Sequence, residues 1–308
     1  MLTVLALDSL ALARGEENLT FRHLSFENVE EDDPVFDVSG QAWHDPPAPP
    51  ITPIALTEAQ AIALPRLAIV VATETELRQV LRVITPLPGQ STILKATSYD
   101  TFYLGTFGAY QTVITLSTMG PLGPGGATLT TAATIQLWNP TVVLMVGIAF
   151  GANRDKQKPA DVLVTEHLVP YEHQRVGKEL IFRNTIPPSS PPLVDRFRNT
   201  LGWRFNRPDG TSCGKHVGQV LSGEKLIDSQ PYKDVLLQRF PTAIGGEMEG
   251  AGLYAACVRA NKPWILVKGV CDWGDGKKND TYHEMAAAAA VSLCMHVFSD
   301  PHSLDGIC

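Results

Sequence analysis

The chain has 308 residues, a hydrophobic fraction of 44% and a formal net charge of −7 at pH 7. Its length and apolar content suffice for one large α/β domain, or two small ones, with a sizeable core. An acidic chain has no overall positive field for a phosphate backbone, so the composition argues against nucleic acid as the main partner.

The five cysteines indicate a reducing compartment, because their number is odd and none has a Cys-x-x-Cys spacing. We therefore expect no disulfide framework, no metal site and no cofactor. The apolar residues 1–13 resemble a signal-peptide core, but Asp8 interrupts them and no Lys or Arg precedes it. The longest apolar run, 141–150, is too short to span a bilayer. These features predict a cytoplasmic protein without a membrane partner.

Residues 1–65 differ in composition from the rest of the chain. They contain an acidic run at 27–34 and a proline-rich connector at 45–53, followed by a possible short helix at 57–64. Such a composition is typical of an appendage and linker. We expect this segment to tether the main domain or to contact a partner protein.

From residue 66 the chain alternates between strand and helix patterns. The apolar run 66–72 predicts a strand buried on both faces. Further strands are predicted at 92–105, 110–117, 141–151, 161–169, 218–227 and 263–272, and helices at 75–84, 127–138, 247–260 and 284–298. A polar, proline-rich stretch covers 183–210. The alternation predicts an α/β fold with a mixed, mainly parallel sheet over residues 66–300, followed by a tail at 301–308.

Acidic residues follow three of the predicted strands or their neighbouring segments. Glu76 comes after the first strand, Glu247 and Glu249 follow the segment TAIGG, and Asp272 ends the last strand. Ligands of such sheets bind at the carboxyl ends of the strands. The glycine-rich residues 119–127 and the small residues of GIAFG would let a flat ligand approach the backbone. The three segments therefore predict one site at one sheet edge.

Each acid also has a purely structural interpretation. Thr73 and Glu76 match a capping box, and Glu247 and Glu249 suit a first helical turn. Asp272 suits the cap of a turn. Three unrelated caps at one sheet edge would be a coincidence that a single site does not require, but the capping role of each acid stays open as an alternative.

Six segments resemble the purine nucleoside phosphorylase and nucleosidase superfamily, most closely its methylthioadenosine/S-adenosylhomocysteine nucleosidases. They are VATETEL, GPLGPGGATL, VLMVGIAFG, LSGEKLID, EMEGAG and VKGVCDWGD. A closer likeness is to phosphorylase-like domains of bacterial defence and NLR-type proteins, carried by GIAFG, Lys156–Gln157, Tyr171–Gly177 and Cys271–Asp280. The resemblance covers roughly residues 66–300. It implies a three-layer fold with a twisted central sheet between helices, and a homo-oligomer.

The resemblance also implies roles for the acids in cleaving an N-glycosidic bond. Asp272 would protonate or hydrogen-bond N7 of adenine, Glu249 would bind the ribose hydroxyls, and Glu76 would orient and deprotonate a water molecule. Further substrate contacts are expected from Met248, Gly147, Ile148, Ala149, Leu226, Ile227, Gly120 and Gly123. Two departures are that Ile148 and Phe150 replace small residues, and that Lys268 stands where an arginine is usual.

Hydrolysis is favoured over phosphorolysis, because neither ATETE nor MGPLGPGGA carries an arginine for phosphate. Arg154, Lys156 and Arg175 follow strand ends, where they would bind a 5′-phosphate chain or form an ordinary charged surface. The defence likeness implies ATP as substrate, with adenine and ribose 5′-triphosphate as products and an antiphage setting. A phosphate-dependent phosphorylase and a catalytically silent purine sensor remain as alternatives.

Several reactive residues are assigned to packing. Cys271 has no histidine nearby in the sequence that would activate it as a nucleophile. His167, His173 and His283 lack the spacing of metal ligands. We expect these side chains to be structural.

Overall fold

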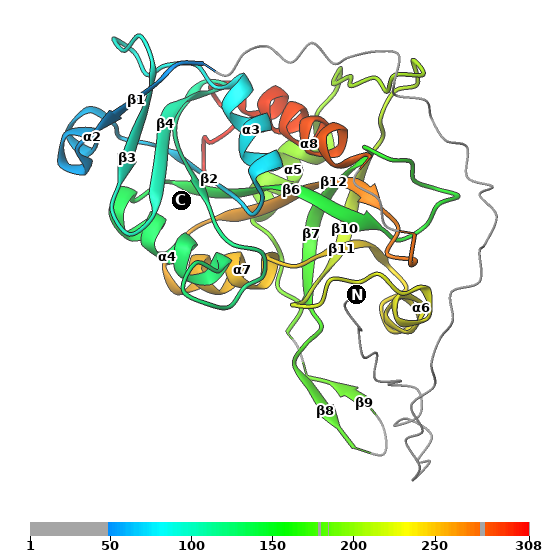
Figure 1. The fold of residues 1–308 in the computed structure, drawn as a ribbon. Helices are drawn as coiled ribbons and strands as arrows, with labels where there is room; N and C mark the ends of the chain where they lie inside the picture. The colour runs from blue at the N-terminus through cyan, green and yellow to red at the C-terminus, as the bar shows by residue number, and fades with distance from the viewer. Residues whose placement is uncertain (1–48, 178–179, 184, 278–280, 308) are drawn as a thin grey trace, which may run out of the picture.

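The computed structural model describes residues 49–177, 180–183, 185–277 and 281–307. A ten-stranded sheet forms the centre, in the order β1-β3-β4-β5-β2-β6-β11-β10-β7-β12 (Figure 1). The strands are β1 (Ile51–Ile54), β2 (Leu67–Val71), β3 (Ile93–Thr97), β4 (Thr101–Phe107), β5 (Tyr110–Leu116), β6 (Val142–Gly151), β7 (Val162–Pro170), β10 (Lys215–Ser222), β11 (Ala243–Glu247) and β12 (Trp264–Asp272). A separate hairpin consists of β8 (Gln174–Val176) and β9 (Leu180–Phe182). Parallel pairings predominate, which confirms the predicted mixed, mainly parallel sheet.

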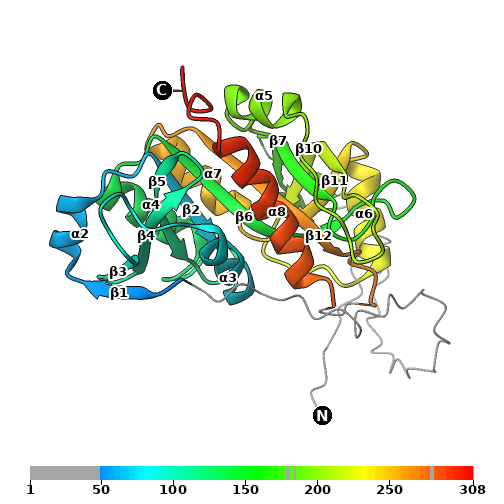
Figure 2. The same ribbon diagram turned by 90° about the horizontal axis from the view of Figure 1, so that it is seen from above.

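Helices cover both faces of the sheet and complete the expected three layers (Figures 1 and 2). They are α2 (Leu56–Ile62), α3 (Glu74–Val83), α4 (Ala127–Trp138), α5 (Pro191–Asn199), α6 (Gln230–Arg239), α7 (Gly250–Arg259) and α8 (His283–Phe298). One core cluster joins α3, α5 and α8 to the sheet, and another joins α2, α4 and α7. All five residues of β2 are buried, as its continuous apolar run predicts.

The strands at one end of the sheet close into a ring. Besides its place beside β2 and β11, β6 also pairs with β12, so β6, β11, β10, β7 and β12 are joined all round. The carboxyl ends of β2, β6 and β12 meet at one edge, because these three strands are mutually parallel. β11 runs antiparallel to β6 and returns along it from this edge. The segment after β11 is thereby brought beside β6 and β12.

Three predicted boundaries differ from the structure. The expected strand 92–105 is divided into β3 and β4 by a turn at 98–100, and the strand expected to reach residue 227 ends at Ser222. Glu247 belongs to β11, so α7 starts three residues later than predicted. Helices α5 and α6 were not predicted. Both carry proline in the first turn, where it is tolerated, and their apolar patterns are short.

The segment preceding the main domain is partly integrated with it. β1 adds to the sheet edge by pairing in parallel with β3, and Ala59 of α2 is buried in the core. The acidic run at 27–34 and residues 45–48 of the predicted linker lie outside the described residues. Among the described helices, none combines the length and hydropathy needed to cross a membrane.

Candidate active site

Glu76 lies at the start of α3, directly beyond the carboxyl end of β2. One carboxylate oxygen, Oε2, accepts the backbone N–H groups of Ala72 at 2.7 Å and Thr73 at 2.9 Å. The other, Oε1, accepts the N–H of Ile148 on β6 at 2.8 Å. The Thr73 hydroxyl accepts the N–H of Glu76, which completes the predicted capping box. Glu76 therefore caps α3 and also connects it to the neighbouring strand.

Glu249 is held at the N-terminus of α7 by a hydrogen bond and an ion pair. Its Oε1 accepts the backbone N–H of Gly120 from the glycine-rich loop at 3.0 Å, and its Oε2 lies 3.1 Å from Nζ of Lys268 on β12. Both side chains are buried. Three distant segments thus converge on one carboxylate.

Glu247 supports the position of Glu249 from the end of β11. Its carboxylate accepts the backbone N–H of Glu249 at 2.9 Å and that of Gly250 at 2.8 Å. Nζ of Lys268 lies 3.7 Å from its Oε2. From the sequence, Lys268 is only a departure from the usual arginine, whereas the structure places its ammonium between two glutamates.

The cluster of Glu76, Glu247, Glu249 and Lys268, here called the acid cluster, is buried and strongly coupled. Burial raises the pKa of Glu76, although the charge of Lys268 opposes the shift. Burial likewise raises the pKa of Glu247 to about 7, against the effect of Lys268. For Lys268, burial alone lowers the pKa, but the three glutamates outweigh it and raise the pKa above its ordinary value. Lys268 therefore stays charged, while Glu247 titrates near neutrality.

Asp272 lies outside the acid cluster, four residues beyond Lys268 on β12. Lys268 pairs with Gly147 and Asp272 with Phe150, with a bulge between Val270 and Asp272. Three residues along β6 correspond to about 10 Å. Glu249 is the ion-pair partner of Lys268. A ligand that contacts both Glu249 and Asp272 must therefore extend along this edge of the sheet.

Asp272 is partly buried and takes part in a local turn. Its Oδ1 accepts the N–H of Gly274 at 2.9 Å, and its Oδ2 accepts the thiol of Cys271 at 3.1 Å. Ligand atoms of Cys271, Asp272 and His283 all lie within 4.8 Å of one another. Cys271 has no histidine nearby in the sequence, but the start of α8 brings His283 close to it in space.

Two glycines shape the acid cluster, one by leaving space and the other by its backbone conformation. A Cβ at Gly147 would lie 2.0 Å from Oε1 of Glu76, so any larger residue would displace this carboxylate. Gly120 has a φ of +87°, a conformation that favours glycine, and in it the N–H reaches Glu249.

The remaining residues predicted to contact substrate differ in how far they are exposed to solvent. Ile148 and Met248 are half-buried, Ala149 is buried, and Gly123 is exposed in the glycine-rich loop. Leu226 has 57% of its surface exposed, but Ile227 is buried and packs in a core cluster with Phe150. The Ile227 side chain thus belongs to the core.

The predicted cations do not form one compact group. Arg154 pairs with Asp275 at 2.5 Å and lies over the ring of Trp273 at 5.4 Å. Lys156 is exposed in the same loop. Arg175 is exposed on the β8–β9 hairpin, which projects away from the sheet (Figure 1). Arg154 lies near the end of β12, with Lys156 two positions along the same loop, whereas Arg175 lies on the β8–β9 hairpin.

The loop that carries Arg154 and Lys156 is anchored by Asp161. This carboxylate pairs with the buried Arg207, accepts the N–H of Gly214 at 2.6 Å, and lies 2.9 Å from Nε2 of His216. Burial alone would raise the pKa of Asp161, but hydrogen bonds from His216 and the backbone, with the charge of Arg207, lower it to about 2.

Asp161→Asn should destabilise the protein by about 3–5 kcal/mol, because Arg207 would keep a buried charge without its partner. Asp161 has a pKa below its ordinary 3.8, so its stabilising effect is present above that pH and is lost as the pH falls towards about 2. Urea unfolding of both proteins at neutral pH and at decreasing pH measures this. The stability difference should shrink only in acid; a difference that is negligible at neutral pH would contradict the assignment.

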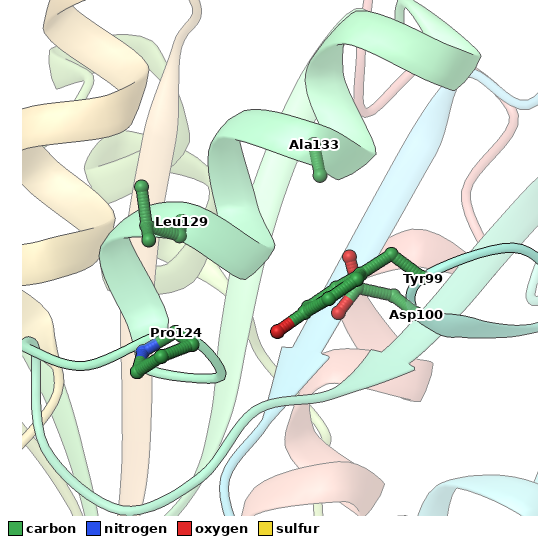
Figure 3. A pocket seen from close by; sticks show the side chains of 5 residues that line it. All are labelled: Tyr99, Asp100, Pro124, Leu129 and Ala133. Atoms are coloured by element: carbon green, nitrogen blue, oxygen red, sulfur yellow. The ribbon is translucent and has the colours of Figure 1, made fainter.

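Two cavities are lined by none of the predicted site residues. Figure 3 shows the first, of about 280 Å³, which is lined by Tyr99 and Asp100 from the β3–β4 turn, by Pro124 of the glycine-rich loop, and by Leu129 and Ala133 of α4. The second, of about 300 Å³, lies between α5 and the end of α8. Neither contains a member of the acid cluster.

The family comparison covers most of the chain. Residues 66–298 match the family model described as "Phosphorylase superfamily". This range runs from the start of β2 to the end of α8 and includes the acid cluster and Asp272.

Similar proteins include nucleosidases. A "Death domain-containing ATP nucleosidase" from Amphimedon queenslandica is 27% identical over 76% of this chain and 48% of its own length. This chain therefore spans about half of that relative. A 5′-methylthioadenosine/S-adenosylhomocysteine nucleosidase from Staphylococcus epidermidis is 26% identical over 62% of this chain and 81% of its own.

Solved structures agree in fold. The 5′-methylthioadenosine/S-adenosylhomocysteine nucleosidase from Neisseria meningitidis, in complex with methylthio-immucillin-A, superposes with a TM-score of 0.63 at 18% identity. The match covers 76% of this chain and 98% of that one. At this identity the likeness establishes the shared three-layer fold.

Proposed function

This chain belongs to the phosphorylase superfamily, and on that premise we propose that it is an adenine nucleosidase that hydrolyses the bond between adenine and ribose. The observation that carries the proposal is the convergence of Glu76, Glu249 and Lys268 at the edge where β12 ends in Asp272. Three buried carboxylates around one ammonium leave an excess of negative charge. Such a site favours a substrate that develops positive charge, as a ribosyl group does when its base departs.

Each acid has one step in this reaction. Asp272 donates a hydrogen bond or proton towards N7 of adenine, which lowers the cost of the departing base's negative charge. Glu249 binds the ribose hydroxyls and stabilises the developing sugar cation. Glu76 orients the attacking water and accepts its proton, and burial makes it a stronger base by raising its pKa above the ordinary value.

Water is a better nucleophile for this site than phosphate. The backbone N–H groups of Ala72, Thr73 and Ile148 point to the Glu76 carboxylate, and that of Gly120 points to Glu249. Phosphate would need these donors, and it would meet carboxylates of its own sign. Phosphorolysis remains the second enzymatic candidate because Gly123 and its loop start a helix.

The finer proposal is that ATP is the substrate and that adenine and ribose 5′-triphosphate are the products, in a defence setting. It is supported by the relative named as an ATP nucleosidase, and by Arg154 near the end of β12 with Lys156 in the same loop. Arg154 would exchange Asp275 for a phosphate oxygen. We further propose a homo-oligomer, since Met119, Leu122 and Leu129 expose apolar side chains around the glycine-rich loop.

The test is to incubate the protein with ATP, adenosine or methylthioadenosine, with and without phosphate, and to quantify free adenine. Release without phosphate is expected, fastest from ATP. Strict dependence on phosphate would instead identify a phosphorylase. Binding of a purine without release from any substrate would identify a sensor and overturn the proposal.

Gly147→Ala should lower adenine release by about 10²-fold, because the new Cβ would displace the Glu76 carboxylate from its position. Steady-state kinetics should place the loss in kcat. The matched control is thermodynamic: the destabilisation by Gly147→Ala should be smaller in a Glu76→Ala background, where the clash is absent. Equal destabilisation in both backgrounds would show that the glycine does not make room for Glu76.

A further inference from the structure

Cys271, Asp272 and His283 bring three different metal-ligand types together beside the proposed acid. A thiol sulfur, a carboxylate oxygen and an imidazole nitrogen lie within 4.8 Å of one another. We propose that these side chains form a Zn²⁺ site and that bound Zn²⁺ inhibits the enzyme by withdrawing Asp272 from the reaction. The inhibition, but not the metal site, rests on the proposed function.

The fold creates this cluster through a bulge and a helix start. The register of β12 against β6 shifts between Val270 and Asp272, which leaves Cys271 in the bulge. Bulges re-aim side chains next to functional sites. The chain then turns, and α8 begins at His283 and packs against β12. The ligands are adjacent in space although His283 comes eleven positions after Asp272, so no short sequence motif reveals them.

The ligand set favours zinc over harder cations. Zn²⁺ binds thiolate, imidazole and carboxylate in a tetrahedral arrangement, with bonds of about 2.0–2.3 Å. Mg²⁺ and Ca²⁺ prefer oxygen ligands and would not select Cys271 or His283. Three protein ligands leave the fourth position to water. Cys271 is buried, whereas Asp272 and His283 are half-buried. The proposed site is therefore closed to solvent at Cys271 and partly accessible at the other two ligands.

Binding requires small, balanced changes. The Cys271 thiol, which donates to Asp272 at 3.1 Å, loses its proton to solvent as a Zn–S bond forms. His283 binds through a ring nitrogen, and Asp272 binds through the oxygen that previously accepted the thiol. No group is oxidised or reduced. With its oxygen bonded to the metal, Asp272 can no longer donate to an adenine nitrogen. A chelator that removes the Zn²⁺ should restore this donation and with it the activity.

The site can be measured without substrate by titrating the protein with Co²⁺, which reports thiolate ligation through an ultraviolet charge-transfer band. We expect this band in the natural protein, its loss in Cys271→Ser, and its displacement by Zn²⁺. His283→Gln should weaken Co²⁺ binding by at least about tenfold, since even outer partners of metal ligands contribute 10–100-fold. His302→Gln, which changes an exposed histidine beside Asp305, is the matched control and should keep the band.

Adenine release is then followed at increasing Zn²⁺, with each variant compared to its own metal-free rate. The natural protein and His302→Gln should be inhibited and then rescued by EDTA. Cys271→Ser and His283→Gln should need at least about tenfold more Zn²⁺ for the same inhibition. Circular dichroism checks that the variants are folded.

The outcomes separate the site from the reaction. A missing cobalt band in the natural protein, or an unchanged band in both ligand variants, would overturn the metal site. A confirmed band with unchanged activity in saturating Zn²⁺ would overturn the inhibition. Absence of adenine release under all conditions would refute the proposed function, while the cobalt spectrum would still decide the site.

Discussion

Asp272→Asn should lower the rate of adenine release by about 10²-fold or more, towards the upper limit of about 10⁴ for general acid catalysis. The amide cannot supply the carboxyl proton, although its shape and its place at the end of β12 are kept. Its oxygen can still accept the N–H of Gly274, so the turn should survive. The loss should therefore appear in kcat, with unfolding temperature nearly unchanged.

Asp300→Asn is the matched control for this substitution, since Asp300 is exposed near the end of α8. It should release adenine at the natural rate. If Asp272→Asn also kept the natural rate, Asp272 would not be the acid, and the proposed mechanism would lose its leaving-group step.

Lys268→Met should both destabilise the protein and reduce its activity. Removing one partner of a buried ion pair costs about 3–5 kcal/mol, because the remaining charge is left uncompensated. Here Glu247 and Glu249 would both lose their cation. Glu249 would also lose one of its two positioning contacts, and a misplacement of about 1 Å can cost about 10²-fold in rate. Chemical unfolding and steady-state kinetics measure the two effects.

The loss of stability in Lys268→Met should depend on pH in a defined direction. Glu247 has a pKa raised from 4.5 to about 7 in the folded protein. Protonation of Glu247 therefore contributes to folding stability fully below about pH 4.5, and this contribution is lost as the pH rises through about 7. Without Lys268 the raising effect of burial is unopposed, and the variant should gain more stability on acidification than the natural protein does.

Two substitutions control for the chemistry of this change. Lys262→Met removes an exposed ammonium that contacts Asn139 and should have little effect. Lys268→Arg keeps the charge and should recover part of the activity. If Lys268→Met were as stable as Lys262→Met at neutral pH, the acid cluster would not depend on its ammonium.

The structural interpretation is confirmed for Glu76, which completes a capping box, and for Asp272, which accepts the N–H of Gly274. It is wrong for Glu247, which lies in β11 and not in a first helical turn, while Glu249 is the N-cap residue of α7 but makes no side-chain cap hydrogen bond. A cap and a site residue are therefore not exclusive here. Backbone donors at a helix start hold a carboxylate in one position, and this is also what an active site requires.

The sequence by itself determined the buried strands, most helices and the acids at their ends. These features depend on local patterns, such as the apolar run of β2 and the Thr73–Glu76 spacing, which are set by residues close along the chain. It also carried the family resemblance, since short motifs in a fixed order need no coordinates.

Only the tertiary structure decided how those acids are charged and what surrounds them. The antiparallel return of β11 beside β6 brings Glu247 and Glu249 to Lys268, and the closure of β6 onto β12 sets Asp272 across from Phe150. The start of α8 likewise brings His283 to Cys271. Such contacts depend on strand order and burial over long separations, and the electrostatic coupling of a buried lysine with three glutamates exists only once water has been excluded around them.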